Sequence, residues 1–242
     1  MDTLRVTAGT IDLATNYLGL DHNLDAIRAT LPKHDEHLAA ALVHAPGLRL
    51  MRQPAWECLA TFITSSMKQV AHIRQISLKL RQRFGKPVAT FEGVELFAYP
   101  DPLALARAGE AALRECGLGY RAKFLHQTAA RIAEGSFDIE AVRALDDEAA
   151  EAKLCELPGV GPKIAQCTLL FGYERLGMFP VDVWIERVLR QLYFAKARRP
   201  PKTPRLKAFI REHFGPYRGY AQQWLFHHAR TGGVFRRGSK RD

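Results

Sequence analysis

Apolar residues recur at spacings of three and four along almost the whole chain, and alternating strand patterns are scarce. This spacing places apolar side chains on one face of a helix. One such face carries Val70, Ile73, Leu80 and Phe84, and Gly85 follows it. Short turns rich in Gly and Pro separate the periodic segments. The pattern therefore predicts an all-α fold in which helices pack into a two-lobed body.

Further helices are expected at 22–30, 34–44, 55–64, 120–133, 146–156, 183–193 and 206–214. Only 4–7 and 88–96 carry weak extended patterns. We interpret residues 1–242 as a single two-lobed domain, with a loop at 197–204 and a flexible basic tail at 232–242.

Composition narrows the class of protein. With 242 residues and 47% hydrophobic residues, the chain is long enough to bury a core without disulfides. No apolar run reaches the roughly 18 residues of a membrane span, and charged residues interrupt the first thirty. We expect an intracellular protein without a membrane partner, acting as a monomer.

The four cysteines lie far apart, at Cys58, Cys116, Cys155 and Cys167. They form neither a CxxC pair nor a cluster with histidines at metal-ligand spacing. We predict no metal and no iron–sulfur cluster, and expect the cysteines to be small buried residues.

The positive charge is concentrated near the C-terminus. The chain carries +10 overall, and residues 196–242 hold 13 Lys and Arg against two acidic residues. Aromatic residues are interleaved with these bases. Such a block is typical of a solvated arm or of an ordered surface that binds a polyanion, and the aromatic residues favour the surface.

The sequence LPGVGPKIAQC, from Leu157 to Cys167, predicts a helix, a tight turn and a second helix over about 148–172. Glycines end the first helix, and Pro162 suits the first turn of the next. Backbone amides at Gly159, Val160 and Gly161, with the positive end of the second helix dipole, form a candidate phosphate-binding site. Two glycines in such a turn are weak evidence when taken alone.

Lys163 lies at the start of the second helix, where the dipole disfavours a cation and favours a neutral, nucleophilic amine. Cys167 follows four residues later, on the same helical face. Asp182, in FPVDVWIERVL, precedes a third helix and can cap it. A carboxylate so held can also stabilise positive charge that develops at a sugar C1′. An amine and a carboxylate together suit cleavage of an N-glycosidic bond.

Four blocks, in this order, carry a resemblance: RLMRQPAWECLATFITSS, CGLGYRAKF, LPGVGPKIAQC with PVDV, and FGPYRGYAQQWLF. They resemble the helix–hairpin–helix superfamily of base-excision DNA glycosylases, and within it the 8-oxoguanine DNA glycosylases. The resemblance implies double-stranded DNA containing an oxidised purine as partner. It also implies that Lys163 forms a Schiff base and that Asp182 is the catalytic carboxylate.

The same resemblance assigns the base pocket and the DNA contacts. Cys167 and Phe226 would sandwich the flipped base, and Gln222 would hydrogen-bond its Watson–Crick edge. Tyr120 would wedge into the base stack, with Arg121 beside it. The lysine mechanism requires no redox cofactor or catalytic metal, although the family's hairpin carbonyls hold a monovalent cation.

Three positions depart from the family pattern. Met67 stands where the family has an asparagine that fills the gap left by the flipped base, and His72 replaces an arginine that reads the opposite cytosine. Trp184 replaces a histidine that contacts a phosphate. The family's eukaryotic members also begin with an antiparallel β domain, and we expect that domain to be largely absent here, with only the LRVTA stretch as a remnant.

Other functions stay open. Glycosylases for alkylated bases or mismatched adenine usually have the aspartate without the lysine, and those for oxidised pyrimidines usually add four clustered cysteines. A DNA-binding module that uses the hairpin without catalysis would bind duplexes without turnover. A helical RNA-binding or structural protein would make the Lys163 and Asp182 spacing a coincidence.

Overall fold

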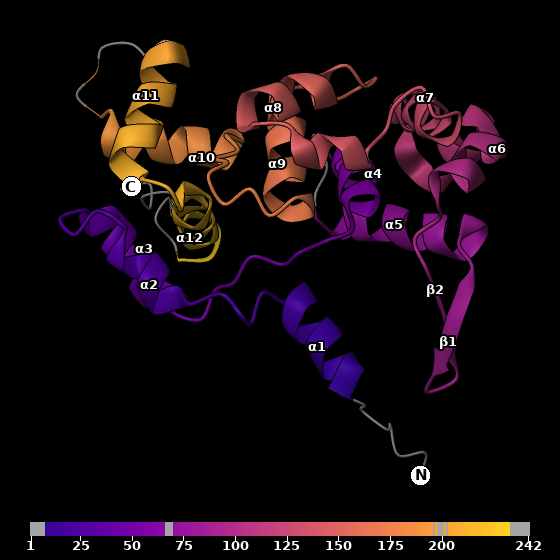
Figure 1. Ribbon diagram of the computed structural model, residues 1–242, viewed down its shortest axis with the longest axis horizontal. Coiled ribbons are helices and arrows are strands. Elements are labelled where there is room, and N and C mark those ends of the chain that lie inside the picture. Colours follow the sequence, from indigo (N-terminus) through magenta and orange to yellow (C-terminus); the bar gives the residue numbers. More distant parts are fainter. Residues whose placement is uncertain (1–7, 66–69, 196, 198–200, 202, 233–242) are drawn as a thin grey trace, which may run out of the picture. The chain divides into compact units, whose positions relative to one another are not determined.

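The computed structural model describes residues 8–65, 70–195, 197, 201 and 203–232. It divides into two compact units, unit 1 with residues 1–52 and 174–242 and unit 2 with residues 53–173. The fold is all-α, as predicted, and the described residues form twelve α-helices and one two-stranded sheet (Figure 1). No helix among these residues has the length and apolar character needed to cross a membrane.

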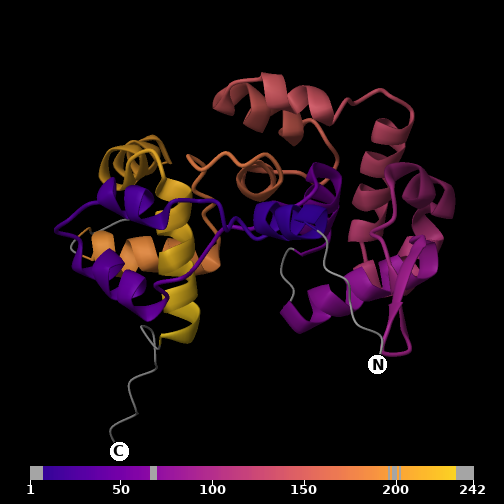
Figure 2. The ribbon, with the colours of Figure 1, turned by 60° about the horizontal axis from the view of Figure 1, so that its bottom comes forward.

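Unit 1 is organised around its last helix, α12, which packs against α3 and α10 (Figure 2). Tyr220 and Trp224 of α12 are fully buried, and the Trp224 indole donates to the carbonyl of Ala45 at 2.9 Å. The helices of this unit are α1 (Ala8–Tyr17), α2 (Leu24–Ala29), α3 (Glu36–His44), α10 (Val183–Val188), the π-helical η3 (Leu189–Tyr193), α11 (Thr203–Phe214) and α12 (Arg218–Thr231).

The burial of Tyr220 and Trp224 corrects one expectation. We interpreted the aromatic residues among the C-terminal bases as part of a basic surface, but these two rings form the core of unit 1. Their burial contributes hydrophobic stabilisation of about 2–3 kcal/mol each. On the same helix Arg230 is exposed, and Arg218 is partly exposed and donates to the carbonyl of Gly215 at 3.3 Å.

Asp35 joins three segments of unit 1. Its side chain is buried and caps α3 by accepting from the amide of Leu38 at 2.9 Å. It also accepts from the Tyr193 hydroxyl and lies 2.8 Å from Nε2 of His213. Burial opposes the charged form, but the hydrogen bonds from Leu38, His213 and Tyr193 outweigh it and lower the pKa of Asp35 below its usual 3.8.

Replacing Asp35 with alanine should destabilise the fold by about 2–4 kcal/mol, because the cap is lost and two buried partners lose their acceptor. Since the pKa of Asp35 is lower in the folded state, its contribution is present at neutral pH and is lost as the pH falls through the folded pKa. Chemical denaturation of wild type and of Asp35→Asn at pH 7 and pH 3 tests this pH dependence. Wild type should lose more stability over that interval than Asp35→Asn, and equal losses would contradict the assignment.

The most extensive helix packing in unit 2 is that of α4 on α9 and of α6 on α7. Cys58, Leu59 and Leu169 are fully buried in the first pair. The elements of unit 2 are α4 (Ala55–Ser65), α5 (Val70–Phe84), β1 (Pro87–Phe91), β2 (Val94–Phe97), α6 (Pro102–Leu113), the π-helical η1 (Arg114–Leu118), α7 (Arg121–Ala133), the 3-10 helix η2 (Glu140–Ala144), α8 (Asp147–Cys155) and α9 (Pro162–Gly172).

The weak extended pattern at 88–96 forms a β-hairpin. β1 and β2 pair antiparallel, and their turn places Glu92 and Gly93 at φ +48° and +76°. Two consecutive positive φ angles are the geometry of tight hairpin turns. Figure 1 shows the hairpin extending away from the helices of its unit, in agreement with the exposure of Phe91 and Val94.

The other boundaries follow the sequence patterns, with a few differences. The helices α1 and α6 and the short η1 and η2 were not among the expected ranges. The predicted loop 197–204 is too long, since α11 begins at Thr203 and takes Pro204 into its first turn, where proline is tolerated. Residues 4–7, and the predicted tail apart from Gly232, lie outside the described residues.

Candidate functional site

The hairpin between α8 and α9 requires glycine at one position for two reasons. Gly159 has φ +77°, a left-handed conformation that favours glycine. A Cβ atom at this position would lie 2.7 Å from the ring of Phe124 on α7. The turn is therefore packed directly against the α7 helix, and Gly159 allows that close approach.

Hydrogen bonds from α7 hold the hairpin in place. The buried Thr128 hydroxyl donates to the carbonyl of Pro158 at 3.1 Å, and the Arg131 guanidinium donates to the carbonyl of Glu156 at 2.7 Å. Gly161 is the N-cap of α9 and supplies no side chain to cap it. The first amides of α9, at Lys163 and Ile164, have no acceptor within the helix and are available to an anion.

The two hairpin glycines give a matched test of this geometry. Gly159→Ala should lower stability by about 1–3 kcal/mol, because the methyl group meets Phe124. Gly161→Ala should change stability by less than about 0.5 kcal/mol, because a Cβ there meets nothing within 4 Å. The added methyl stands at the proposed phosphate position, so duplex binding should still weaken several-fold. Thermal melts and fluorescence anisotropy separate the effects, and unchanged binding by Gly161→Ala would contradict a phosphate site.

Lys163 is the second residue of α9 and is partly exposed. Its ammonium lies 5.0 Å from the centroid of the Phe62 ring on α4, and Phe62 stacks on Phe171. No carboxylate among the described residues of unit 2 lies within 4 Å of this ammonium, so no ion pair within the unit holds the amine. The Phe62 ring restricts the conformations of the Lys163 side chain without blocking its nitrogen.

Cys167 lies one turn further along α9 and is 5% exposed. Burial of Cys58 is the main reason that the pKa of its thiol is raised, and the nearby Cys167 is the second. Cys58 and Cys116 are also buried, as expected, whereas Cys155 is partly exposed. Contact between Cys167 and a flipped base stays a prediction.

Asp182 caps α10 through one carboxylate oxygen. Its Oδ1 accepts from the amides of Trp184 and Ile185 at 3.0 and 2.9 Å. The helix is short and continues as η3, so the predicted helix at 183–193 is present with a change of pitch. Among the described residues of unit 1, no partner binds Oδ2. The cap fixes the carboxylate group and leaves its second oxygen available to a positive charge.

Gln222 and Phe226 lie one turn apart on α12. Gln222 is 3% exposed, and its amide donates to the carbonyl of Pro180 at 3.0 Å. Its Oε1 accepts from Gln223 at 2.6 Å. One N–H and one lone pair of the amide remain for another partner. Phe226 is partly exposed, with the Arg230 guanidinium 5.3 Å from its ring centroid.

Tyr120 is presented on the surface of unit 2. It is 59% exposed, follows Gly117 and Gly119 at positive φ, and comes directly before α7. The guanidinium of the buried Arg121 donates to its hydroxyl at 2.6 Å and lies 4.7 Å from its ring centroid. This support holds the tyrosine outward, as a wedge requires.

His72 is exposed on α5, and its Nε2 lies 3.7 Å from the position that a Cβ would take at Gly117. The structure therefore brings His72 beside the glycine segment that presents Tyr120. Trp184 is partly exposed in the first turn of α10. Met67 lies outside the described residues.

The predicted residues are divided between the units. Unit 2 contains the hairpin, Lys163, Cys167, His72, Tyr120 and Arg121, and unit 1 contains Asp182, Trp184, Gln222 and Phe226. Within each unit the geometry agrees with the predicted roles, but those roles themselves stay predictions. Sequence patterns missed the supporting contacts from Phe62, Phe124 and the Pro180 carbonyl, because packing across helices leaves no local sequence pattern.

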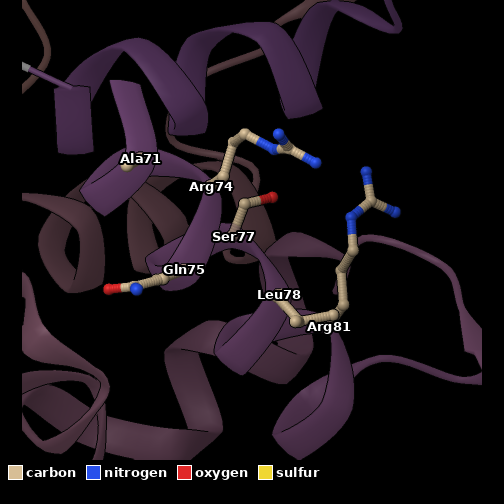
Figure 3. Close-up of a pocket in the computed structure, with 6 residues that line it drawn as sticks. All are labelled: Ala71, Arg74, Gln75, Ser77, Leu78 and Arg81. Atoms are coloured by element: carbon tan, nitrogen blue, oxygen red, sulfur yellow. The ribbon is translucent and has the colours of Figure 1, made fainter. Parts of the chain in front are cut away.

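An open cavity of about 520 Å³ lies along α5 and contains none of the predicted site residues. Figure 3 shows the guanidinium groups of Arg74 and Arg81 on the same side as the Ser77 hydroxyl. Arg81 is paired with Glu57 and donates to the carbonyl of Phe97 at 3.2 Å. The lining offers cations but no base that would activate the Ser77 hydroxyl, and we assign the cavity no part in the chemistry.

Comparison with known families decides the class of protein. The model of the HhH-GPD superfamily of base excision DNA repair proteins matches residues 60–211, which include the hairpin, Lys163 and Asp182. This chain belongs to that superfamily. The model of the 8-oxoguanine DNA glycosylase N-terminal domain matches residues 5–59. Within that stretch, residues 8–59 form helices and turns without a strand.

Relatives within the HhH-GPD superfamily include DNA lyases. The chain is 31% identical to a "Probable N-glycosylase/DNA lyase" from Methanothermobacter thermautotrophicus, over 84% of this chain and 70% of the relative. It is 30% identical to "N-glycosylase/DNA lyase OGG1" from Arabidopsis thaliana, over 87% and 60%. The alignment thus spans less than two thirds of the plant protein.

Solved structures agree with the fold. The Clostridium acetobutylicum 8-oxoguanine glycosylase/lyase, in complex with double-stranded DNA containing cytosine opposite 8-oxoguanine, superposes with a TM-score of 0.87 at 29% identity. The match covers 95% of this chain and 78% of that one. The Archaeoglobus fulgidus 3-methyladenine DNA glycosylase, with a TM-score of 0.76 and 23% identity over 94% and 78% of the two chains, shows the shared fold.

Proposed function

We propose that this protein is a bifunctional 8-oxoguanine DNA glycosylase of base excision repair. It removes 8-oxoguanine from duplex DNA and then nicks the strand by β-elimination. The observation that carries this proposal is Lys163, whose amine forms no ion pair with the described residues of its unit and stands at the start of α9, a helix without a side-chain N-cap. Relatives that match most of the chain are named N-glycosylase/DNA lyase and 8-oxoguanine glycosylase/lyase, which supports the same activity.

Binding begins with the phosphate backbone. The uncapped amides at Gly161 and the start of α9 hold one phosphate without side-chain charge, while surface bases contact others. Tyr120, supported by the buried Arg121, wedges into the base stack beside the lesion, and the damaged nucleotide rotates out of the helix. Gln222 then uses its free N–H and lone pair on the Watson–Crick edge, and Cys167 and Phe226 enclose the base. Trp184 adds a contact near Asp182.

Cleavage follows from the amine and the carboxylate. The neutral Lys163 amine attacks C1′, the bond from C1′ to the base nitrogen breaks, and the base leaves with the bonding pair. Oδ2 of Asp182 stabilises the positive charge that develops on the sugar. The sugar ring opens to an imine, loss of a 2′ proton expels the 3′ phosphate, and water releases the lysine.

This chemistry needs no redox cofactor, because the nucleophile and the charged stabiliser are side chains of the protein. We also propose a structural monovalent cation at the hairpin carbonyls. The Leu157 carbonyl, which accepts from the amide of Val160 at 3.1 Å, retains a second lone pair for such an ion. The protein works as a monomer, inside the cell on DNA.

Single-turnover excision on duplexes with 8-oxoguanine opposite each of the four bases tests the proposal. Excision with strand nicking is expected. The preference for cytosine opposite the lesion should be weaker than in a protein with arginine at position 72, because histidine lacks the forked donors of a guanidinium. Duplex binding without any excision would contradict the proposed function and favour a non-catalytic hairpin module.

A further inference from the structure

The two groups that act on C1′ under the proposed function belong to different units. Lys163 lies in unit 2 and Asp182 in unit 1, and the chain passes between the units at residues 52 to 53 and again at 173 to 174. A displacement of about 1 Å between reacting groups can slow a reaction roughly 100-fold. Residues that fix the two crossings are therefore placed to affect the reaction.

Side chains join the two crossings directly. Arg52 is the last residue before the first crossing, and Glu174 is the first residue after the second. Nη2 of Arg52 donates to Oε1 of Glu174 at 2.5 Å. One residue further into unit 2, the amide of Gln53 donates to the carbonyl of Phe171 at 2.8 Å. The two crossing segments are thus hydrogen-bonded to each other within unit 1, through Arg52 and Glu174, and within unit 2, through Gln53 and Phe171.

Arg52 is itself held by several acceptors. Its guanidinium binds both carboxylate oxygens of Asp21, at 2.6 and 2.9 Å, and the carbonyl of Asn16 at 2.9 Å. Such forked pairing fixes direction as well as distance. The hydrogen bond from Arg52 lowers the pKa of Glu174, so the carboxylate is charged at neutral pH.

His22 extends these contacts to the helix of the proposed base pocket. Its Nε2 lies 2.7 Å from Oε1 of Glu174, and its Nδ1 lies 2.6 Å from the hydroxyl of Tyr220. Nε2 also lies 2.8 Å from Nη2 of Arg52, so the imidazole contacts both members of the Arg52 and Glu174 pair. Tyr220 is fully buried on α12, two residues before Gln222. One imidazole therefore connects the crossings to α12.

The backbone at Glu174 is strained. Its φ is +57°, a left-handed conformation that costs a non-glycine residue about 1–3 kcal/mol. Such a conformation persists when surrounding contacts over-determine it. Here the carboxylate is bound by both Arg52 and His22. If position 174 served only to form the turn, glycine would be the better residue there. The contacts with Arg52 and His22 require a carboxylate instead.

We propose that Arg52, Glu174 and His22 are positioning residues for base excision, because they bind the segments at which the chain passes from one unit to the other. This inference rests on the proposed function. It makes a specific distinction between two reactions of the same lysine. Excision of 8-oxoguanine requires both groups, whereas imine formation with a ready-made abasic aldehyde requires Lys163 without the carboxylate.

Glu174→Gln and Glu174→Gly test this distinction. Glutamine removes the charge, and glycine relieves the φ strain, which guards against loss of the fold. Glu140→Gln, in an exposed ion pair with Arg143, is the control. For each variant we would measure the single-turnover excision rate on 8-oxoguanine duplex and the rate of borohydride trapping on an abasic duplex.

Both Glu174 variants should slow excision roughly 10- to 100-fold while trapping on abasic DNA changes less than about two-fold. The control should match wild type in both assays. Equal loss in both reactions, or no loss of excision, would overturn the positioning role. Wild type that traps abasic DNA but excises no 8-oxoguanine would instead contradict the proposed function.

Discussion

Replacing Lys163 with glutamine is expected to abolish the borohydride-trapped adduct and to lower the excision rate on the order of 10⁴-fold or more. The reason is chemical, because glutamine has no nucleophilic amine and cannot form an imine. The fold should be unaffected, since Lys163 is partly exposed and its ammonium contacts only the Phe62 ring among the interactions described for it. Gel-resolved trapping and single-turnover kinetics measure both effects.

Lys153→Gln is the matched control. This lysine lies on α8, pairs with Glu156 at 2.8 Å, and is also within reach of an aromatic ring, that of Phe137. Its loss should leave trapping and excision unchanged and should alter stability by less than about 1 kcal/mol. If Lys163→Gln retained a trapped adduct, a different amine would be the nucleophile and the assignment would be wrong.

Replacing Asp182 with asparagine should slow excision by about 10²- to 10³-fold while the melting temperature stays close to that of wild type. Asparagine keeps the oxygen that accepts from the amides of Trp184 and Ile185, and it is as good an N-cap as aspartate. It lacks the negative charge that stabilises the sugar cation. Trapping on a ready-made abasic duplex, which needs no such charge, should be nearly unchanged.

Asp182→Ala separates the two roles of this side chain. It removes the cap as well as the charge, so it should lose about 1 kcal/mol of stability in addition to activity. If Asp182→Asn excised 8-oxoguanine at the wild-type rate, capping would be the only role of the residue. Loss of stability in Asp182→Asn would show that the charge itself holds α10.

The sequence predicts best where a backbone requirement is local. The glycines and proline of LPGVGPK predicted the hairpin and the restart of the helix at Pro162, and Asp182 was expected to cap the helix that follows it. These features depend on φ angles and amide hydrogen bonds within a few residues. The weak pattern at 88–96 predicted extended backbone there, but not the β-hairpin with its turn at Glu92 and Gly93 that the structure shows.

Features that depend on distant residues were not predictable. Gly159 is needed for its contact with Phe124 as well as for its turn, and Phe124 lies 35 residues earlier in the sequence. Tyr220 and Trp224 lie among bases in sequence but form the core of unit 1, where the Trp224 indole donates to the carbonyl of the distant Ala45. The contacts between Arg52, Glu174 and His22 join segments that share no local pattern.

The central claim is that Lys163 is the nucleophile of an 8-oxoguanine glycosylase. The most direct test is borohydride trapping of the wild-type protein on duplex DNA containing 8-oxoguanine, followed by mass spectrometry of the cross-linked peptide. We predict one adduct, on the Lys163 side chain, formed as the free base is released. Release of 8-oxoguanine without an adduct, or an adduct at another amine, would contradict this claim.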